Sequence, residues 1–411
     1  MGSTPFDYTH LLAPDLPAPA ARWQGFPEFN FVGGHNDADG VPVAELIDAM
    51  TTVLQREGKT LATYNLASGP QGYQTLRAFV AEKVQRQRGI RCTADDVLIT
   101  SGSLQGIDLV NEVFLAPGDT VLVEQFTYAG ALTRLRRRGV NIIGIPLDQE
   151  GLRTDCLAET LEKLRREGTQ AKYIYTIPTV QNPTGAVMGE QRRLELLRLA
   201  ADYKVAVFED ECYADLLWEG TSPPALRAMD EQHQVIHIGS FSKSIAPALR
   251  VGYVVADWPV MSRLLSCKTD AGSGALEQMV LAEFCARHFD QHVTALNQRL
   301  QQKAQTLVEA LNQYFGTAAE FTRPDGGIFL WVKLPAEVDT LALAQVAAAE
   351  GITFNPGPEW STDAEPARSS LRICFANPSH DNLRAGVAKL AEICARETGI
   401  PSRIANIGQA G

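Results

Sequence analysis

Lys243 lies between two serines, and Arg250 follows it seven residues later. The apolar runs Val235–Ile238 and Val251–Val255 flank this segment, as expected for a loop between buried strands. Partial burial lowers the pKa of a lysine and frees its amine to attack an aldehyde. Hydroxyls and a guanidinium next to that amine can bind a phosphate. A solvated lysine in an ordinary loop fits the segment equally well.

Short apolar strands alternate with helices over much of the chain. We predict strands at residues 96–100, 120–124, 141–145, 172–176 and 205–209, and helices at residues 73–88 and 103–114. Near-continuous apolar strands separated by helices indicate an α/β fold with a largely parallel sheet covered on both faces. Functional side chains should then gather in loops at the carboxyl ends of the strands.

The pattern changes beyond about residue 275. A long helical stretch at residues 278–314 precedes short apolar runs at residues 326–332, 351–354 and 370–375. This order suits a smaller α+β domain, and 411 residues suffice for two domains. We predict an N-terminal arm with part of the small domain over residues 1–60. A large domain over residues 61–290 and a small C-terminal domain over residues 291–411 would follow.

Polar and aromatic residues follow the predicted strands. Ser103 and Leu104 open a helix whose free N–H groups could bind an anion, although a simple helix cap is the plainer interpretation. The ends of later strands carry Tyr128, Asn182, Asp210 and Tyr213. The aromatic ring of Tyr128 could lie flat on a planar ring of a ligand.

The order and spacing of five such motifs resemble those of pyridoxal-phosphate-dependent enzymes of the aspartate aminotransferase fold, that is, fold type I and aminotransferase class I/II. The Gln-Asn-Pro-Thr-Gly run at residues 181–185 and the Asp-x-x-Tyr form at residues 210–213 are most similar to the branch of 2-aminoadipate and kynurenine aminotransferases. The resemblance runs from about Phe31 to Phe375. It implies pyridoxal 5'-phosphate as cofactor, a large domain with a mostly parallel mixed sheet flanked by helices, and a smaller α+β domain.

The resemblance also implies a role for each cofactor residue. Lys243 would hold the cofactor as a Schiff base and shuttle a proton, while Asp210 would face the pyridine nitrogen. Asn182 and Tyr213 would hydrogen-bond the cofactor phenolate, and Tyr128 would stack on its ring. The phosphate would be bound by Ser103, the Leu104 N–H, Ser240, Ser242 and Arg250, and by Tyr64 from the partner subunit of a homodimer.

Three further residues would bind the substrate together with Asn182. Arg372 matches the arginine that binds the α-carboxylate, although a structural ion pair is an alternative. Gly34 matches the backbone at the substrate entrance, or it is an ordinary turn glycine. Trp360 stands where the family commonly has phenylalanine beside the substrate side chain, and a core or surface role fits it equally well.

The resemblance implies an aminotransferase that moves the amino group of an L-amino acid to a 2-oxo acid, with 2-oxoglutarate expected as acceptor. The same residues also serve elimination, cyclisation or other carbanion chemistry, because fold and cofactor motifs do not separate these outcomes. A third hypothesis is the pyridoxal-phosphate-binding domain of a regulator. It is disfavoured because only about thirty residues precede the first motif and the net charge is -11.

Composition and charge exclude several other classes. The acidic balance argues against nucleic acid as the main partner. No apolar run reaches the roughly 18 residues of a membrane helix. Seven cysteines never form a Cys-x-x-Cys pair, and seven histidines show no ligand spacing. We therefore expect no metal, no disulfide framework and a cytoplasmic location.

Overall fold

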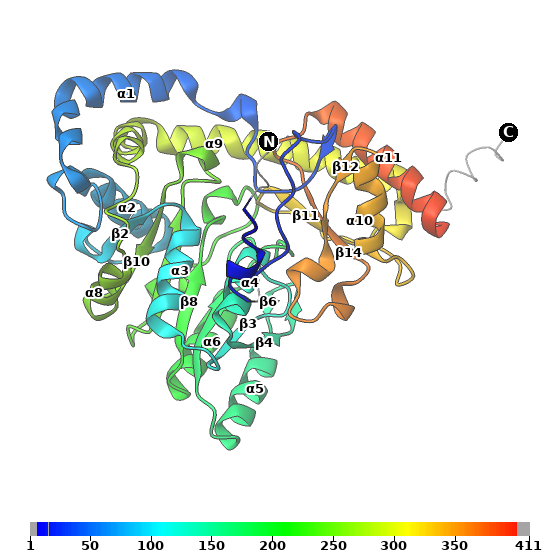
Figure 1. Cartoon of the computed structure of the whole chain (residues 1–411), viewed down its shortest axis with the longest axis horizontal. Coiled ribbons are helices and arrows are strands. Elements are labelled where there is room, and N and C mark those ends of the chain that lie inside the picture. The colour runs from blue at the N-terminus through cyan, green and yellow to red at the C-terminus, as the bar shows by residue number, and fades with distance from the viewer. Residues whose placement is uncertain (1–5, 15, 401–411) are drawn as a thin grey trace.

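The computed structural model describes residues 6–14 and 16–400. A seven-stranded sheet in the order β2-β10-β9-β8-β7-β3-β4 forms its centre (Figure 1). The strands are β2 (Val97–Thr100), β3 (Thr120–Glu124), β4 (Asn141–Ile145), β7 (Ala171–Thr176), β8 (Ala206–Asp210), β9 (Val235–Ser240) and β10 (Gly252–Val255). All pairings are parallel except those of β10, which is antiparallel to both neighbours. The predicted α/β class with a mostly parallel mixed sheet is confirmed.

Alternate residues of these strands pack under helices on opposite faces of the sheet. On β2, Leu98 packs in one core with α3 (Ser103–Phe114), α4 (Ala129–Arg138) and α8 (Trp258–Cys267). Its neighbours Val97 and Ile99 face α2 (Gln74–Arg88) and α9 (Ala275–Tyr314). Further along the sheet this second face is covered by α5 (Thr154–Arg166), α6 (Glu190–Asp202) and α7 (Leu226–Met229). Burial on both faces explains why the strands are almost wholly apolar.

A smaller layer lies beside the main sheet. It contains the antiparallel strands β11 (Phe329–Lys333), β14 (Ser370–Cys374) and β13 (Asn355–Pro356). The N-terminal strand β1 (Phe29–Asn30) pairs with β12 (Ile352–Thr353), so the start of the chain joins this layer. The helices α10 (Thr340–Ala349) and α11 (His380–Thr398) complete it, and β5 (Leu147–Asp148) and β6 (Gly151–Leu152) form a separate hairpin.

The 40-residue helix α9, about 60 Å long, connects the two layers. Its residues from Met279 to Phe289 pack against α2, and those from Leu296 to Leu311 pack with the small layer. Helix α1 (Val43–Glu57) lies along α9 (Figure 1). Because α9 is divided between two cores, we propose the domain boundaries predicted from the sequence, at residues 1–60, 61–290 and 291–411. Residues 1–5 and 401–411, at the two ends of these ranges, lie outside the described part of the chain.

Three further observations concern the described part of the chain. Each of its helices is too short or too polar to cross a bilayer. It holds no group of three or more His, Cys, Asp or Glu side chains placed to bind a metal ion. All seven cysteines are free thiols.

Candidate active site

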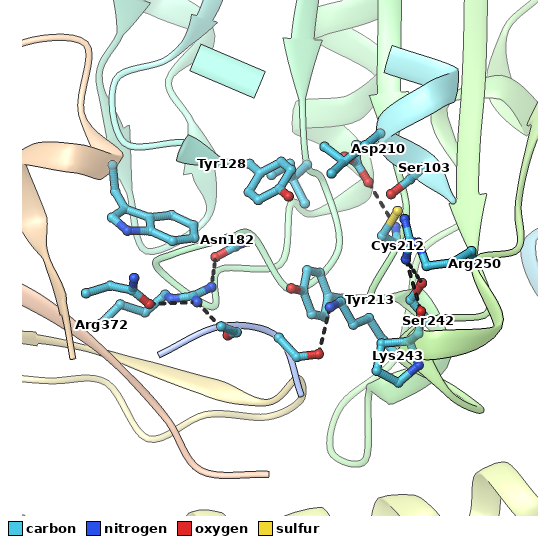
Figure 2. Close-up of a pocket in the computed structure, with 17 residues that line it drawn as sticks. Ser103, Tyr128, Asn182, Asp210, Cys212, Tyr213, Ser242, Lys243, Arg250 and Arg372 are labelled. Carbon is cyan, nitrogen blue, oxygen red and sulfur yellow. Dashed lines mark hydrogen bonds between the residues drawn. The ribbon is translucent and has the colours of Figure 1, made fainter. Parts of the chain in front are cut away.

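A cavity of about 230 Å³ lies at the carboxyl ends of the parallel strands, where the large sheet meets the small layer. Most predicted site residues line it, namely Gly34, Ser103, Leu104, Tyr128, Asn182, Asp210, Tyr213, Ser242, Lys243, Arg250, Trp360 and Arg372. The sequence did not single out its other lining residues, which are Gly33, Ile177, Cys212, Pro247 and Asn355. Figure 2 shows Arg372 at one end of the pocket and Ser103, Ser242 and Arg250 at the other.

Lys243 is the pocket's amine. Its Nζ donates a hydrogen bond to the Gly34 carbonyl oxygen at 2.9 Å and lies 6.0 Å from the centre of the Tyr213 ring. Burial lowers the pKa of Lys243, which favours the uncharged, nucleophilic amine. A Cβ at position 34 would collide with Nζ, so a larger residue there would displace the Lys243 amine.

Asp210 ends β8 with its carboxylate held by two donors. Its Oδ2 accepts a hydrogen bond from the Tyr175 hydroxyl at 2.7 Å, and its Oδ1 accepts one from the Cys212 N–H at 3.1 Å. Burial nevertheless raises the pKa of Asp210. A carboxylate in this state is suited to a cationic N–H donor from a ligand, because such a donor would restore its ionised form.

The sequence did not identify Tyr175 as a functional residue. It lies on β7, paired in register with Phe208 of the neighbouring strand β8. The alternation of β7 could have shown that Tyr173 and Tyr175 share one face. It could not have shown that the hydroxyl of Tyr175 reaches Asp210, because that contact depends on the order of the strands.

We expect Tyr175→Phe to lower kcat/KM about 10-fold, the usual cost of losing one hydrogen bond to a charged group. The Tyr175 hydroxyl lowers the pKa of Asp210, so its removal should raise that pKa further and move the acid limb of the rate profile to higher pH. Tyr173→Phe is the matched control, since the Tyr173 hydroxyl donates to Asn111 Oδ1 instead. Identical pH profiles for wild type and Tyr175→Phe would contradict the role.

The end of the pocket away from Arg372 is suited to bind an anion. Ser103 begins α3, whose first turn leaves backbone N–H groups without helical partners. The Arg250 guanidinium crosses this turn, with Nη1 3.5 Å from Ser242 Oγ and Nη2 3.4 Å from the Ser101 carbonyl oxygen. A side chain at Gly102, which has a φ of +74°, would collide with this guanidinium. Hydroxyls, N–H groups and a guanidinium together form a phosphate-binding set.

Two residues predicted at the phosphate do not line the pocket. The hydroxyl oxygen of Ser240 accepts a hydrogen bond from the Ser242 N–H at 3.0 Å, so it shapes the turn that carries Ser242. Tyr64 begins a short 3-10 helix over Tyr64–Ala67 and is 82% exposed. It makes no part of the pocket of its own chain.

The loop that carries Asn182 is fixed by a buried carboxylate, Glu124. Gln181 Nε2 donates to Glu124 Oε2 at 2.9 Å, and Gln181 Oε1 accepts from the Thr184 N–H and hydroxyl. Burial raises the pKa of Glu124 to about 7. These contacts brace the loop on both sides of Asn182, whose Oδ1 accepts a hydrogen bond from Arg372 Nη1 at 3.0 Å.

Arg372 lies on β14, 3% exposed, with its guanidinium carbon 3.9 Å from the centre of the Trp360 ring. Trp360 belongs to a short 3-10 helix over Gly357–Trp360 and is itself buried. Its ring is also 6.0 Å from that of Tyr128. In Figure 2, Arg372 lies at the end of the pocket away from Arg250 and the anion site. Its guanidinium can therefore bind a second negatively charged group of a ligand whose phosphate lies at that anion site.

This set of groups fits pyridoxal phosphate. The cofactor has an aldehyde, a ring nitrogen, a planar ring and a phosphate, and the pocket has a deprotonatable amine at Lys243, a carboxylate at Asp210, the ring of Tyr128 and the anion site at Arg250. Burial raises the pKa of Asp210, and a protonated pyridine nitrogen is a cationic donor that would favour the ionised carboxylate. A Cβ at Gly34 would displace the Lys243 amine, and one at Gly102 would displace the Arg250 guanidinium.

Known proteins are similar to this chain in sequence and fold. Residues 34–390 match the family described as aminotransferase class I and II. The chain is 31% identical over 371 residues to aromatic-amino-acid aminotransferase 1 of Thermococcus litoralis, covering 90% of this chain and 88% of the relative. It is 32% identical over 366 residues to a 2-aminoadipate transaminase of Thermus thermophilus, covering 88% of each. A kynurenine aminotransferase from Pyrococcus horikoshii, solved with PMP, superposes with a TM-score of 0.84 at 30% identity, covering 90% of this chain and 91% of that one.

Two relatives from Bacillus subtilis carry the name of uncharacterized HTH-type transcriptional regulators, and this chain spans 66% and 65% of their lengths. The family match covers most of the present chain, and the relatives matched over nearly their whole lengths are named as aminotransferases. The chain therefore belongs to the class I and II aminotransferases and is a pyridoxal-phosphate-dependent aminotransferase of fold type I.

Proposed function

We propose that this aminotransferase moves the amino group of an L-amino acid to 2-oxoglutarate, in the shared active sites of a homodimer. The observation that supports this most is the placement of Lys243, Asp210 and Arg372 around one cavity. An amine, a carboxylate and a carboxylate-binding guanidinium are the groups that amino-group transfer requires.

Pyridoxal phosphate, when bound, supplies a ring that withdraws electrons from the substrate α-carbon. Lys243 Nζ would hold the cofactor, then take the α-proton and return a proton during transfer. Asp210 would face the ring nitrogen, with its carboxylate oriented by Tyr175 and the Cys212 N–H. The groups proposed to bind the remaining atoms are Ser103, the Leu104 N–H, Ser242 and Arg250 for the phosphate, Asn182 and Tyr213 for the phenolate, and Tyr128 for the ring face.

Arg372 would bind the α-carboxylate through a bidentate pair of N–H groups. An amino acid and a 2-oxo acid both carry this carboxylate, so one guanidinium serves both substrates in turn. Gly34 and Trp360 also line the pocket, and we propose that they contact the substrate or the groups that hold it.

Isotope transfer tests this function. We expect a ¹⁵N-labelled L-amino acid to pass its label to 2-oxoglutarate, giving one labelled glutamate for each donor consumed. A panel of donors run with and without the acceptor would also measure donor preference. Consumption of the amino acid at full rate without any oxo acid would favour elimination or cyclisation and contradict the proposal.

An exposed apolar stripe on α1 supports the homodimer. Val43, Ile47, Met50 and Leu54 recur at helical spacing and are 40–59% exposed, while a different face of α1, with Ala49 and Val53, is buried and α1 packs on α9. Exposed patches of this kind commonly mark interfaces. Tyr64 follows the stripe and is exposed, as expected for a side chain that reaches the phosphate site of a partner subunit.

We expect Leu54→Asp to shift the protein toward monomer and to weaken pyridoxal phosphate binding, because each site would lose Tyr64 of the other subunit. Leu194→Asp is the matched control, since Leu194 is 44% exposed on α6 and Leu54 is 40% exposed. Sedimentation velocity and cofactor titration measure the two effects. A fully active wild-type monomer at assay concentration would contradict the homodimer.

We also propose a cytoplasmic location and no nucleic acid or membrane partner. Seven free thiols favour a reducing compartment. The net charge of -11 opposes binding to nucleic acid.

A further inference from the structure

The guanidinium of Arg372 is already occupied at the nitrogen that a carboxylate needs. Nη2 donates to the Gly33 carbonyl oxygen at 2.8 Å and to Asn355 Oδ1 at 3.0 Å, which uses both of its hydrogens. Nη1 donates one hydrogen, to Asn182 Oδ1. Nε is buried without a hydrogen-bond partner among the described residues.

A carboxylate can chelate a guanidinium in two ways, through Nη1 and Nη2 or through Nε and Nη2. Both modes use a hydrogen of Nη2. Since Gly33 and Asn355 take both of these hydrogens, one of the two acceptors must leave when a bidentate carboxylate binds.

The arginine itself cannot easily turn away to present another edge. Its guanidinium carbon is 3.9 Å from the centre of the Trp360 ring and 5.1 Å from that of Phe329. Arg372 and Trp360 are both more than nine-tenths buried. The exchange must therefore take place at an acceptor.

Asn355 is the acceptor that can move. The Gly33 oxygen is part of the backbone and also accepts a hydrogen bond from Cys374 Sγ at 2.7 Å. The Asn355 amide is a side chain on the two-residue strand β13, it is only half-buried, and it lines the cavity. A rotation of its side chain frees Nη2 without any change of the backbone.

We propose that Asn355 is an exchangeable partner of Arg372, whose amide oxygen occupies Nη2 until a substrate carboxylate displaces it. Asn355 thereby sets how tightly the site binds carboxylates. Between turnovers it keeps the Arg372 guanidinium hydrogen-bonded and correctly oriented. This role rests on the proposed function, in which Arg372 binds the substrate carboxylate, and it makes Asn355 a competitor of that carboxylate for Nη2. It is a role in binding, so KM changes while kcat does not.

Two substitutions of Asn355 should change carboxylate affinity in opposite directions. Asn355→Ala removes the competitor, so we expect carboxylates to bind about 3- to 10-fold more tightly, within the range of the net contribution of one hydrogen bond. Asn355→Asp places a permanent carboxylate beside Nη2, so we expect binding to weaken by on the order of 100-fold. For both variants kcat should stay within about 2-fold of wild type.

The probe is 3-phenylpropionate, a carboxylate that cannot react because it has no amino group to transfer. It is titrated calorimetrically into the pyridoxal-phosphate-loaded protein, for wild type, both Asn355 variants and Arg372→Leu. The uncharged 3-phenylpropanamide controls for contacts of the phenyl ring. Asn141→Asp is the matched control for the added charge, because Asn141 is exposed and lies outside the pocket.

Equal carboxylate affinity in wild type and both Asn355 variants, with binding abolished in Arg372→Leu, would overturn the inference and leave the proposed function intact. Weaker binding in Asn355→Ala would also overturn it, because Asn355 would then support the ligand instead of competing with it. Unchanged binding in Arg372→Leu would overturn both the inference and the assignment of Arg372. If Asn355→Asp does not fold, the Asn355→Ala titration decides.

Discussion

Replacing Lys243 with alanine is expected to lower turnover by about 10⁴-fold, the upper range for loss of a positioned acid–base group. Lys243 Nζ lies in the pocket, where it donates a hydrogen bond to the Gly34 carbonyl oxygen, and burial lowers the pKa of this amine. The uncharged amine can bind the cofactor covalently and can also move the α-proton. Its removal therefore takes away both functions at once. Steady-state turnover with an amino acid and 2-oxoglutarate measures the loss.

Lys172→Ala is the control, because Lys172 lies on β7, is 39% exposed and pairs with Asp119 outside the pocket. We expect it to keep wild-type turnover. A small free amine such as methylamine should restore part of the activity of Lys243→Ala, since it can enter the space left by the side chain. Turnover of Lys243→Ala within about 10-fold of wild type would show that another group moves the proton.

Replacing Asp210 with asparagine is expected to lower kcat by about 10²- to 10³-fold, the usual cost of removing one preorganised electrostatic partner. The charge of Asp210 is needed most when negative charge develops at the α-carbon, so KM should change little. The fold should survive, because burial already raises the pKa of Asp210 and the uncharged amide is less costly to bury than the carboxylate.

Asp210→Glu separates charge from geometry. It keeps the carboxylate but displaces it from the Tyr175 hydroxyl and the Cys212 N–H, so we expect intermediate activity. Thermal unfolding would be recorded for both variants, to confirm that they remain folded. Near-normal kcat in Asp210→Asn would place the partner of the ring nitrogen elsewhere.

Much of the fold is predictable from the apolar pattern. Strand β3 and helix α3 have the bounds that the sequence predicts, because buried strands are short apolar runs and helices have a distinct period. The direction of β10 is not encoded in this pattern, since parallel and antiparallel buried strands look alike in composition. Helix α1 was not predicted, and its apolar side chains lie partly on an exposed stripe that a single-chain core does not explain.

The cofactor end of the site is more predictable than the substrate end. Asp210 ends β8, Lys243 follows β9 by three residues and Arg250 precedes the antiparallel β10 by two, so motif spacing brings them to one edge of the sheet. Asn355 and Tyr175 could not be found this way. The first reaches Arg372 through the pairing of β13 with β14, and the second reaches Asp210 through the pairing of β7 with β8. Both contacts depend on tertiary register.

Finding which lysine carries the cofactor tests the active-site assignment most directly. The protein would be loaded with pyridoxal phosphate, reduced with borohydride, digested and mapped by mass spectrometry. We expect one stoichiometric phosphopyridoxyl label, on the peptide that contains Lys243, and no stoichiometric label in Lys243→Ala. A stoichiometric label on any other lysine would contradict the assignment of the active site.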